Sequence, residues 1–415
     1  MSRHLYLLLF SLYWAQGLPV GFMTHALPVI LRMQGVSLAH IGGFGLLMLP
    51  WSIKILWAPW IDRYGTQRFG HYRSWIIPTQ LCSVLILIAL SFLPIQALDQ
   101  PVFLLTFFAA LMLLNLAGAT QDVATDGLAV HLLTLKQQHW GNTFQVIGSR
   151  LGFIVGGGAL LWALDWLSWQ PTFLVLAALV LLNTLPIVLF KEPAKEVSVF
   201  YEKISCKQSI RQYFNYFLNN RILKSWLGVL VTFKVADGLS GPLLKPLMVD
   251  LGLSLSQIGI YITILGAVAA LFGAVLAGTL LRWMRRTQAL FLFSFFKVLS
   301  LIAYAWLAYC YDQQYRVSHW LIYCINAAED MFSAMLLVVM LTLVMQYSRK
   351  QHAGTDFTFQ VALMATISGL LYTLSGIAGD WLGYAYYLNI IIGISILCMY
   401  PIWLWTKVSQ HPSDV

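Results

Sequence analysis

The sequence predicts an all-α integral membrane protein whose twelve transmembrane helices form two six-helix bundles. Three observations support this. The 415 residues are 59% hydrophobic and only 10% charged, whereas soluble proteins carry roughly 25% charged residues. Apolar runs of about 20 residues, enough to cross a bilayer, recur twelve times along the chain. The longest polar segment, 191–221, separates six of these runs from the other six.

The apolar runs define the expected spans and domains. They lie near 5–30, 40–60, 75–97, 102–133, 143–164, 171–190, 222–249, 257–281, 288–311, 318–346, 357–379 and 382–406. The first run continues to Ile30 with no clear small-residue cleavage site, so we expect a retained span and not a signal peptide. We expect an N-terminal bundle at 1–190, a cytoplasmic linker at 191–221 and a C-terminal bundle at 222–415.

The basic residues predict the orientation in the membrane. With the N-terminus in the cytoplasm, 18 of the 25 lysines and arginines fall in cytoplasmic segments, Arg32 and Arg316 fall outside, and five fall within spans. This bias follows the positive-inside rule and places both termini in the cytoplasm. It also explains the net charge of +9 without a nucleic-acid partner, because the charge is spread over many loops.

Several function classes lack their signatures. The five cysteines show neither zinc-ligand spacing nor a disulfide framework. The glycines at 156–158 lie in a span without a GxxxxGK[ST] motif, and in a span glycines permit close helix packing. No nucleophile–base constellation stands out. We therefore expect no enzymatic activity, no catalytic residue, no metal and no cofactor.

The two halves resemble each other. TFQ at 143–145 and DWL at 165–167 recur at 358–360 and 380–382, in each case 215 residues later. Parallel repeats of six spans joined by a cytoplasmic loop are typical of the major facilitator architecture. That architecture predicts alternating access to a midplane cavity lined by spans 1, 4, 7 and 10.

Charged residues within spans are candidates for function, because a charge at the bilayer centre costs about 2.5 kcal/mol or more. Five bases and five acids belong to this group, which is enough for internal neutralisation. They are Lys54, Asp122, Asp126, Arg150, Lys234, Asp237, Lys245, Lys297, Glu329 and Asp330.

Span 4 carries two acids on one face. Asp122 and Asp126 are four residues apart, so they are neighbours on a helix. Two close carboxylates resist double ionisation, an arrangement suited to carrying a proton. We expect Asp122 to couple transport to protons, and Gln121 and Thr125 to contact a polar substrate. Alternatively, the acids are structural partners of Arg150 or Lys54, and Asp126 is the better candidate for that role.

Spans 10 and 7 add further candidates. Glu329 and Asp330 are adjacent and point about 100° apart on a helix, so one of them faces a central cavity, and we favour Glu329 for proton coupling. In span 7, glycines and prolines surround Lys234, Asp237 and Lys245 and indicate a broken or kinked helix.

Three further substrate contacts are expected in spans 7 and 1. Asp237 and Lys245 are candidates, with Lys245 suited to an anionic group. Lys234 and Asp237 equally have the spacing to satisfy each other. Trp14 in span 1 is a candidate for stacking on a ring-bearing substrate.

The loop after span 2 reads KILWAPWIDRYG at 54–65. Its Asp62-Arg63-x-Gly65 part resembles the cytoplasmic loop signature of major facilitators, and this resemblance implies that Asp62 and Arg63 engage neighbouring helix ends and gate the conformational cycle. Ala58 replaces a usual glycine. The corresponding loop of the second half, LLRWMRRTQ, lacks the acid, so gating there is not expected.

A wider pattern is more specific. GLPVGF at 17–22, GVSLAHIG at 35–42, KILWAPWIDRYG and TQDVATDGLAV at 120–130 together resemble the branch that holds muropeptide permeases, acetyl-CoA transporters and importers of rhizobactin- and pyochelin-type siderophores. The compact chain looks most like the siderophore importers. The resemblance implies a monomeric, multi-pass protein of the bacterial inner membrane that imports a ferric siderophore with protons. Muropeptide uptake, efflux of a small molecule and an integral-membrane enzyme are the alternatives.

Overall fold

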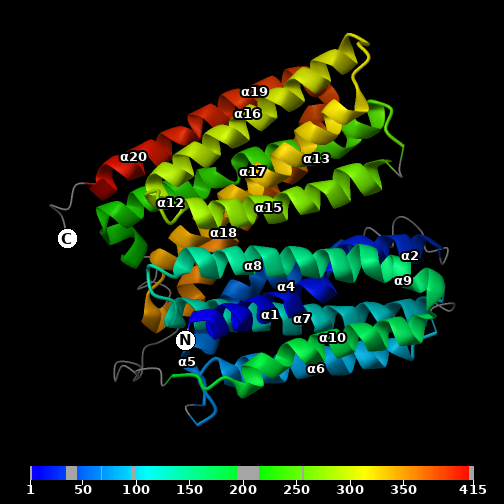
Figure 1. The fold of residues 1–415 in the computed structure, drawn as a ribbon, viewed down its shortest axis with the longest axis vertical. Helices are drawn as coiled ribbons and strands as arrows, with labels where there is room; N and C mark the ends of the chain where they lie inside the picture. Colours follow the sequence, from blue (N-terminus) through cyan, green and yellow to red (C-terminus); the bar gives the residue numbers. More distant parts are fainter. Residues whose placement is uncertain are drawn as a thin grey trace. The chain divides into compact units, whose positions relative to one another are not determined.

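A computed structural model describes residues 2–33, 44–66, 68–94, 100–193, 215–254 and 257–410. Within these ranges the chain is helical, apart from loops and one isolated bridge between Thr66 and Gly70 (Figure 1). The predicted all-α fold class is confirmed. The GVSLAHIG motif and most of the predicted linker, 194–214, lie outside the described residues.

Ten helical segments of the described chain are long and apolar enough to cross a membrane. They coincide with ten of the twelve predicted spans. The span predicted at 357–379 is the 30-residue helix α18 (Ala353–Leu382). The span predicted at 40–60 is a series of short helices: η2 (Phe44–Met48), α4 (Leu49–Ile53), η3 (Lys54–Leu56) and α5 (Ala58–Arg63).

Prolines explain the interrupted second span. Pro50 and Pro59 occupy the first turns of α4 and α5. Proline has no backbone N–H and fits the first turn of a helix better than its interior, so each one favours the start of a new helix. The interruption places Lys54 in the one-turn helix η3, where it is buried.

The chain forms two compact units. One unit comprises Met1–Phe200 with Ser348–Phe359, and the other comprises Tyr201–Tyr347 with Gln360–Val415. Helix α18 therefore begins in the first unit and continues in the second. The bounds predicted for the bundles and the linker remain a prediction.

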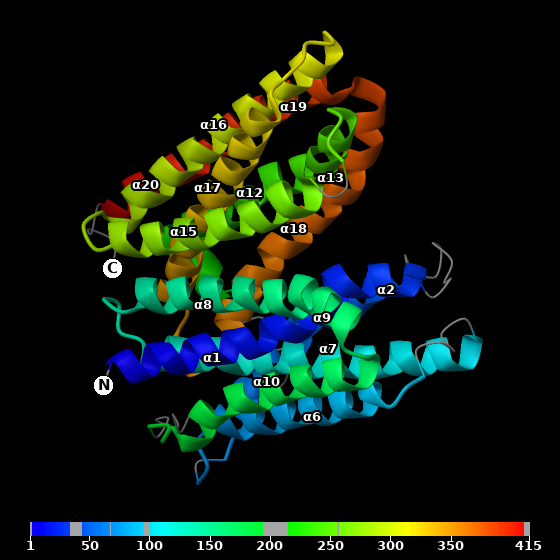
Figure 2. The ribbon, with the colours of Figure 1, turned by 45° about the vertical axis from the view of Figure 1, so that its right-hand side comes forward.

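The first unit is built from six predicted spans and the start of α18. Helix α1 packs against α8, and α6 packs against α7 and α10 (Figures 1 and 2). Its buried core is apolar and includes Phe22, Phe107 and Phe173. Its long helices are α1 (Ser2–Gly21), η1 (Phe22–Ala26), α2 (Leu27–Met33), α6 (Arg73–Ser91), α7 (Pro101–Leu132), α8 (Gln138–Phe153), η5 (Ile154–Ala159), α9 (Leu160–Trp166) and α10 (Trp169–Leu189).

In the second unit α15 packs against α17, α16 against α17 and α19, and α12 against α20 (Figure 2). Span 7 is interrupted at Lys234, which separates α12 from α13, so the predicted break precedes the prolines at 242 and 246. The helices are α12 (Arg221–Phe233), α13 (Val235–Asp250), η7 (Ile258–Ile264), α15 (Leu265–Leu280), α16 (Arg286–Asp312), α17 (His319–Gln346), most of α18, α19 (Tyr384–Leu397) and α20 (Met399–Gln410).

Glycines bring α1 close to the α8–η5 segment. A Cβ atom on Gly152 would lie 2.5 Å from the Cα of Gly17, and one on Gly156 would overlap the carbonyl oxygen of Leu18. Small residues allow such close backbone approach between membrane helices. By contrast, a Cβ on Gly158 would meet no heavy atom within 4 Å.

We predict that Gly156→Val lowers the stability of the purified protein by about 1–3 kcal/mol, the usual cost of overpacking. Gly158→Val, two residues later in the same glycine run, is the matched control, since both changes carry the same intrinsic helix propensity. Thermal unfolding in detergent measures the difference. Equal unfolding midpoints for the two variants would contradict the packing assigned to Gly156.

Candidate functional site

A buried ion pair lies at the centre of the first unit. The Lys54 ammonium contacts the Asp122 carboxylate, and these residues are 4% and 8% exposed. Lys54 also lies 5.3 Å from the centre of the Trp51 ring, in a cation–π arrangement. Trp51 in turn donates from its indole nitrogen to the Asn115 side chain at 2.9 Å. The one-turn helix η3 and helix α7 thus hold opposite charges together inside the bundle.

Asp126 lies one helical turn beyond Asp122 on α7 and has a different environment. The Tyr13 hydroxyl from α1 donates to its carboxylate at 2.7 Å, and the Gln145 amide from α8 donates at 3.4 Å. Asp126 is 2% exposed. The structure records no ion pair for it among the described residues. We call Tyr13, Lys54, Asp122, Asp126 and Gln145 the N-terminal charge cluster.

This geometry decides between the structural partners considered for the two acids. Lys54 pairs with Asp122. Arg150 is half-buried on α8, and no ion pair between it and Asp122 or Asp126 exists within the described chain. Asp126, expected to be the structurally paired acid, is held by neutral hydrogen-bond donors instead.

The predicted contact Gln121 lines a small cavity inside the first unit. The cavity measures about 10 Å³ and is also lined by Gln16, Ser83 and Asn115. That volume is near the minimum that holds one water molecule. The Gln121 amide lies 3.4 Å from the carbonyl oxygen of Leu12, to which it donates.

The other predicted substrate contacts are dispersed. Thr125 is fully buried, and its hydroxyl has no hydrogen-bond partner among the described residues. Trp14 is half-buried with its ring 5.7 Å from that of Phe10. Lys245 is exposed on α13, where it lines a pocket with Asp250. The structure therefore does not bring Lys245 to the acids of α17.

The second unit contains its own cluster around Lys297 on α16. The Lys297 ammonium contacts Glu329 on α17 and lies 2.9 Å from an oxygen of Asp237 on α13. It also donates to the Ser333 hydroxyl at 2.6 Å. Lys234 pairs with the other oxygen of Asp237 at 2.5 Å. We call Lys234, Asp237, Lys297, Glu329 and Ser333 the C-terminal charge cluster.

Glu329 and Asp330 diverge, as the 100° rotation between neighbouring helix residues requires. Glu329 faces Lys297. Asp330 instead accepts a hydrogen bond from the Asn326 amide at 3.0 Å and lies against Gly266 of α15. Asn326 is further fixed by the Tyr304 hydroxyl at 2.9 Å. Glu329, the favoured acid, is therefore the one that joins the charge cluster.

Asp62 at the end of α5 binds the N-terminal end of α18. Its carboxylate accepts from the backbone N–H groups of Gly354 at 3.1 Å and Thr355 at 2.7 Å, and from the Thr355 hydroxyl at 2.7 Å. The Tyr72 hydroxyl adds a fourth bond at 2.7 Å. A helix N-terminus favours a carboxylate, because its backbone N–H groups are unpaired and its dipole is positive there. Arg63 is exposed, with its guanidinium 5.5 Å from the Tyr64 ring.

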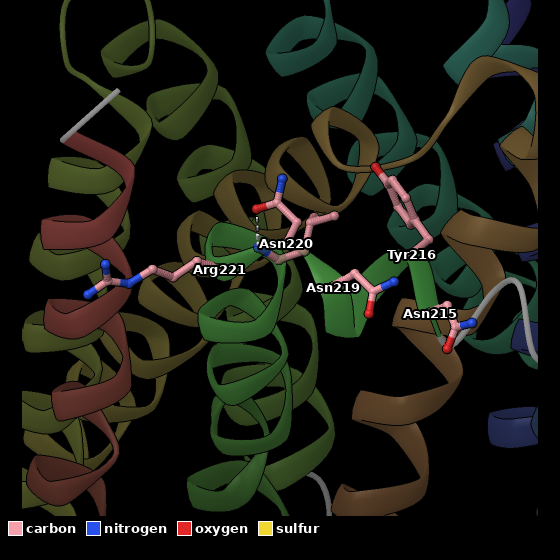
Figure 3. Close-up of a pocket in the computed structure, with 6 residues that line it drawn as sticks. Asn215, Tyr216, Asn219, Asn220 and Arg221 are labelled. Carbon is pink, nitrogen blue, oxygen red and sulfur yellow. Dashed lines mark hydrogen bonds between the residues drawn. The ribbon is translucent and has the colours of Figure 1, made fainter. Parts of the chain in front are cut away.

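A larger pocket lies at the start of α12, and no residue of either charge cluster is among those that line it (Figure 3). It measures about 510 Å³ and is lined by Asn215, Tyr216, Asn219, Asn220, Arg221 and Leu223. The Asn220 side chain caps α12 by accepting from the backbone N–H of Ile222 at 2.8 Å. This structural role accounts for one of its polar side chains, and the predicted site residues do not reach it.

Sequence reasoning missed part of each cluster. Lys297 was recognisable as an intramembrane charge, but its sequence position did not connect it to Asp237 and Glu329. Tyr13 carries no charge, and Gln145 stands out only as part of the repeated TFQ triplet at 143–145, so neither could be linked to Asp126 from sequence. Their contact with Asp126 depends on the packing of α1, α7 and α8.

We predict that Lys54→Met destabilises the protein by about 3–5 kcal/mol, the usual cost of leaving one member of a buried ion pair without its partner. Adding Asp122→Leu to Lys54→Met should recover most of the loss, because no ionised group then remains unpaired at that point. Thermal unfolding of the two variants in detergent measures both effects. A double variant no more stable than the single one would contradict the assigned pair.

The N-terminal half of the chain is similar to a known protein family. A family model described as acetyl-coenzyme A transporter 1 matches residues 4–162, which include Lys54, Asp122 and Asp126. The match covers less than half of the chain.

Curated relatives extend over most of the chain. An anhydromuropeptide permease of Escherichia coli K12 is 28% identical over 366 residues, which cover 86% of this chain and 71% of the permease. A putative transporter AmpG 4 of Rickettsia conorii is 27% identical over 306 residues, covering 72% of this chain and 73% of that protein.

Solved transporters share the fold at low sequence identity. A fucose:proton symporter of E. coli aligns with a TM-score of 0.68 and 15% identity, covering 97% of this chain and 98% of the symporter. A bacterial homologue of the iron transporter ferroportin aligns with a TM-score of 0.70 and 15% identity over 99% of this chain and all of that one. The chain thus has the multi-pass helical fold of these solved transporters, and its sequence is similar to that of an anhydromuropeptide permease and, over residues 4–162, to the acetyl-coenzyme A transporter family.

Proposed function

We propose that this protein imports a cell-wall muropeptide across the bacterial inner membrane, with protons as the driving ion. The observation that carries the proposal is the 28% identity to the anhydromuropeptide permease over 86% of this chain. The second relative is named as a putative transporter. A muropeptide combines sugar hydroxyls, amides and carboxylates, which are groups that polar and charged side chains such as Gln121, Thr125 and Lys245 are suited to bind.

The transport cycle is proposed to be alternating access by a monomer with both termini in the cytoplasm. In this proposal Asp122 and Glu329 contribute to coupling through their ion pairs with Lys54 and Lys297. A change in protonation would rearrange these buried pairs. Arg150 stays a proposed structural charge. Gln121, Thr125, Asp237, Lys245 and Trp14 stay proposed substrate contacts. In this structure Lys245 is exposed, Trp14 and Asp237 are half-buried, and Gln121 and Thr125 are buried.

Ferric-siderophore import is the competing proposal. It was favoured by the motif pattern and by the compact chain. One relative is named as an anhydromuropeptide permease and the other as a putative transporter. Neither name supports siderophore import, so muropeptide uptake becomes the leading proposal. Efflux by the same fold remains a third candidate, distinguished by direction in the same assay.

Uptake experiments separate these candidates. In cells that lack their own muropeptide permease, expression of this protein should restore accumulation of radiolabelled anhydromuropeptide, and a protonophore should abolish it. A panel of ⁵⁵Fe-labelled siderophores, tested in an importer-deficient strain, should show no gain. Siderophore uptake without muropeptide uptake would reverse the proposal, and faster loss of preloaded substrate from the cells would establish efflux.

Asp62 is expected to affect the rate of the transport cycle. Asp62→Asn keeps the shape of the side chain but removes the charge that binds the N-terminal end of α18, so we expect slower transport with little change in substrate affinity. About a tenfold loss in maximal rate corresponds to about 1.4 kcal/mol, close to the lower end of the roughly 1.5–3 kcal/mol that a hydrogen bond to a charged group contributes.

Initial rates of uptake at several substrate concentrations measure this effect. Thr355→Val, which removes one of the four donors to Asp62, should cause a smaller loss in the same direction. An unchanged maximal rate for Asp62→Asn, or a change confined to affinity, would contradict a gating role.

A further inference from the structure

We propose that Asp126, and not its neighbour Asp122, holds the proton within the N-terminal charge cluster. This inference rests on the proposed function only for its consequence in transport. The protonation itself is a property of the protein without substrate. The observations that carry it are the count of charges in the cluster, the pairing of those charges and the hydrogen-bond partners of Asp126.

The N-terminal charge cluster contains one more carboxylate than cations. Lys54 contributes one positive charge, whereas Asp122 and Asp126 contribute two negative charges when both are ionised. Residues four apart on a helix lie roughly 5–6 Å apart at their Cβ atoms. Ionisation of both acids would therefore place two neighbouring negative charges inside an apolar bundle with only one cation to balance them, which is costly. One bound proton makes the cluster neutral.

The pairing decides which acid holds that proton. Lys54 contacts Asp122, so the one cation of the cluster is paired with Asp122 and not with Asp126. Asp126 has no cation among its hydrogen-bond partners, which are the Tyr13 hydroxyl and the Gln145 amide. A protonated Asp126 keeps the Tyr13 bond through its carbonyl oxygen. The arrangement thus stabilises an ion pair at Asp122 and a neutral acid at Asp126.

Neighbouring elements place polar groups around Asp126. Helix α1 presents Tyr13 and helix α8 presents Gln145. Lys54 of the second span pairs with Asp122, one turn away on the same helix as Asp126. On the far side, Tyr72 packs against Gly127, whose added Cβ would lie 2.5 Å from the tyrosine ring. The Tyr72 hydroxyl donates to Asp62, so Asp126 does not share that donor.

Release of the proton changes the balance of the cluster. The O–H bond of Asp126 breaks and the proton passes to water, which leaves two carboxylates competing for one lysine. The negative charge on Asp126 then attracts Lys54 away from Asp122, and hydrogen bonds from Tyr13 and Gln145 stabilise the Asp126 carboxylate. Asp122 contributes to coupling in this scheme because it pairs with Lys54 as long as Asp126 is protonated.

Infrared spectroscopy of the purified protein, without substrate, tests the proposal. A protonated carboxyl gives a C=O band that an ionised carboxylate lacks. We expect such a band at pH 7 in the unsubstituted protein and its loss in Asp126→Asn. Asp62→Asn is the matched control and should keep the band, because Asp62 does not belong to the N-terminal charge cluster and its carboxylate binds the start of α18 instead.

Tyr13→Phe identifies the acid that holds the proton. Loss of the hydroxyl that donates to Asp126 should move the C=O band to higher wavenumber. It should also move the titration of the band toward higher pH by about one unit, because a hydrogen bond that stabilises the ionised form is lost. If Tyr13→Phe fails to fold, Gln145→Leu provides the same test with a smaller shift, in keeping with its longer 3.4 Å bond.

Two outcomes would overturn the proposal. The first is a band at pH 7 that persists unchanged in Asp126→Asn. The second is a band whose wavenumber and titration are unaltered in both Tyr13→Phe and Gln145→Leu, which would place the proton on another acid. A protein that fails to transport muropeptides but shows the expected spectra would contradict the proposed substrate and leave the protonation of Asp126 established.

Discussion

The structure depends on the neutralisation of charge inside apolar helical bundles. An unpaired charge in the membrane interior is among the largest single penalties that a transmembrane helix meets. In the first unit Lys54 pairs with Asp122, and in the second Lys297 lies between Asp237 and Glu329. Because each pair joins residues from different spans, the charges fix which helices pack together. Any change in protonation inside a cluster therefore acts on the arrangement of its helices.

The interrupted second span illustrates how local structure and charge placement are connected. Pro50 and Pro59 divide that span into short helices, and the break positions Lys54 where its side chain reaches α7. At the other end of the same segment, Asp62 binds the N-terminal end of α18. This one segment, interrupted by two prolines, thus contributes both the cation of the N-terminal charge cluster and the carboxylate that holds α18.

Much of this was predictable from sequence, because the lipid solvent imposes simple rules. The apolar runs predicted the helical fold, and the rarity of charge within them singled out Asp122, Asp126 and Glu329. The partners were not predictable with the same certainty. Contacts such as Tyr13 to Asp126 join residues 113 positions apart, and they depend on packing that periodicity does not encode. The substrate depends on the shape and chemistry of a binding site, which composition does not encode. The proposal of a muropeptide substrate therefore rests on sequence identity to a named permease.

The central claim is that muropeptide entry and proton entry are one process. Its most direct test is the external pH of lightly buffered proteoliposomes that contain the purified protein, recorded as anhydromuropeptide is added outside. The account predicts that the medium becomes more alkaline as the muropeptide enters, and that the change disappears without protein or with a protonophore. Muropeptide entry at constant external pH would contradict it.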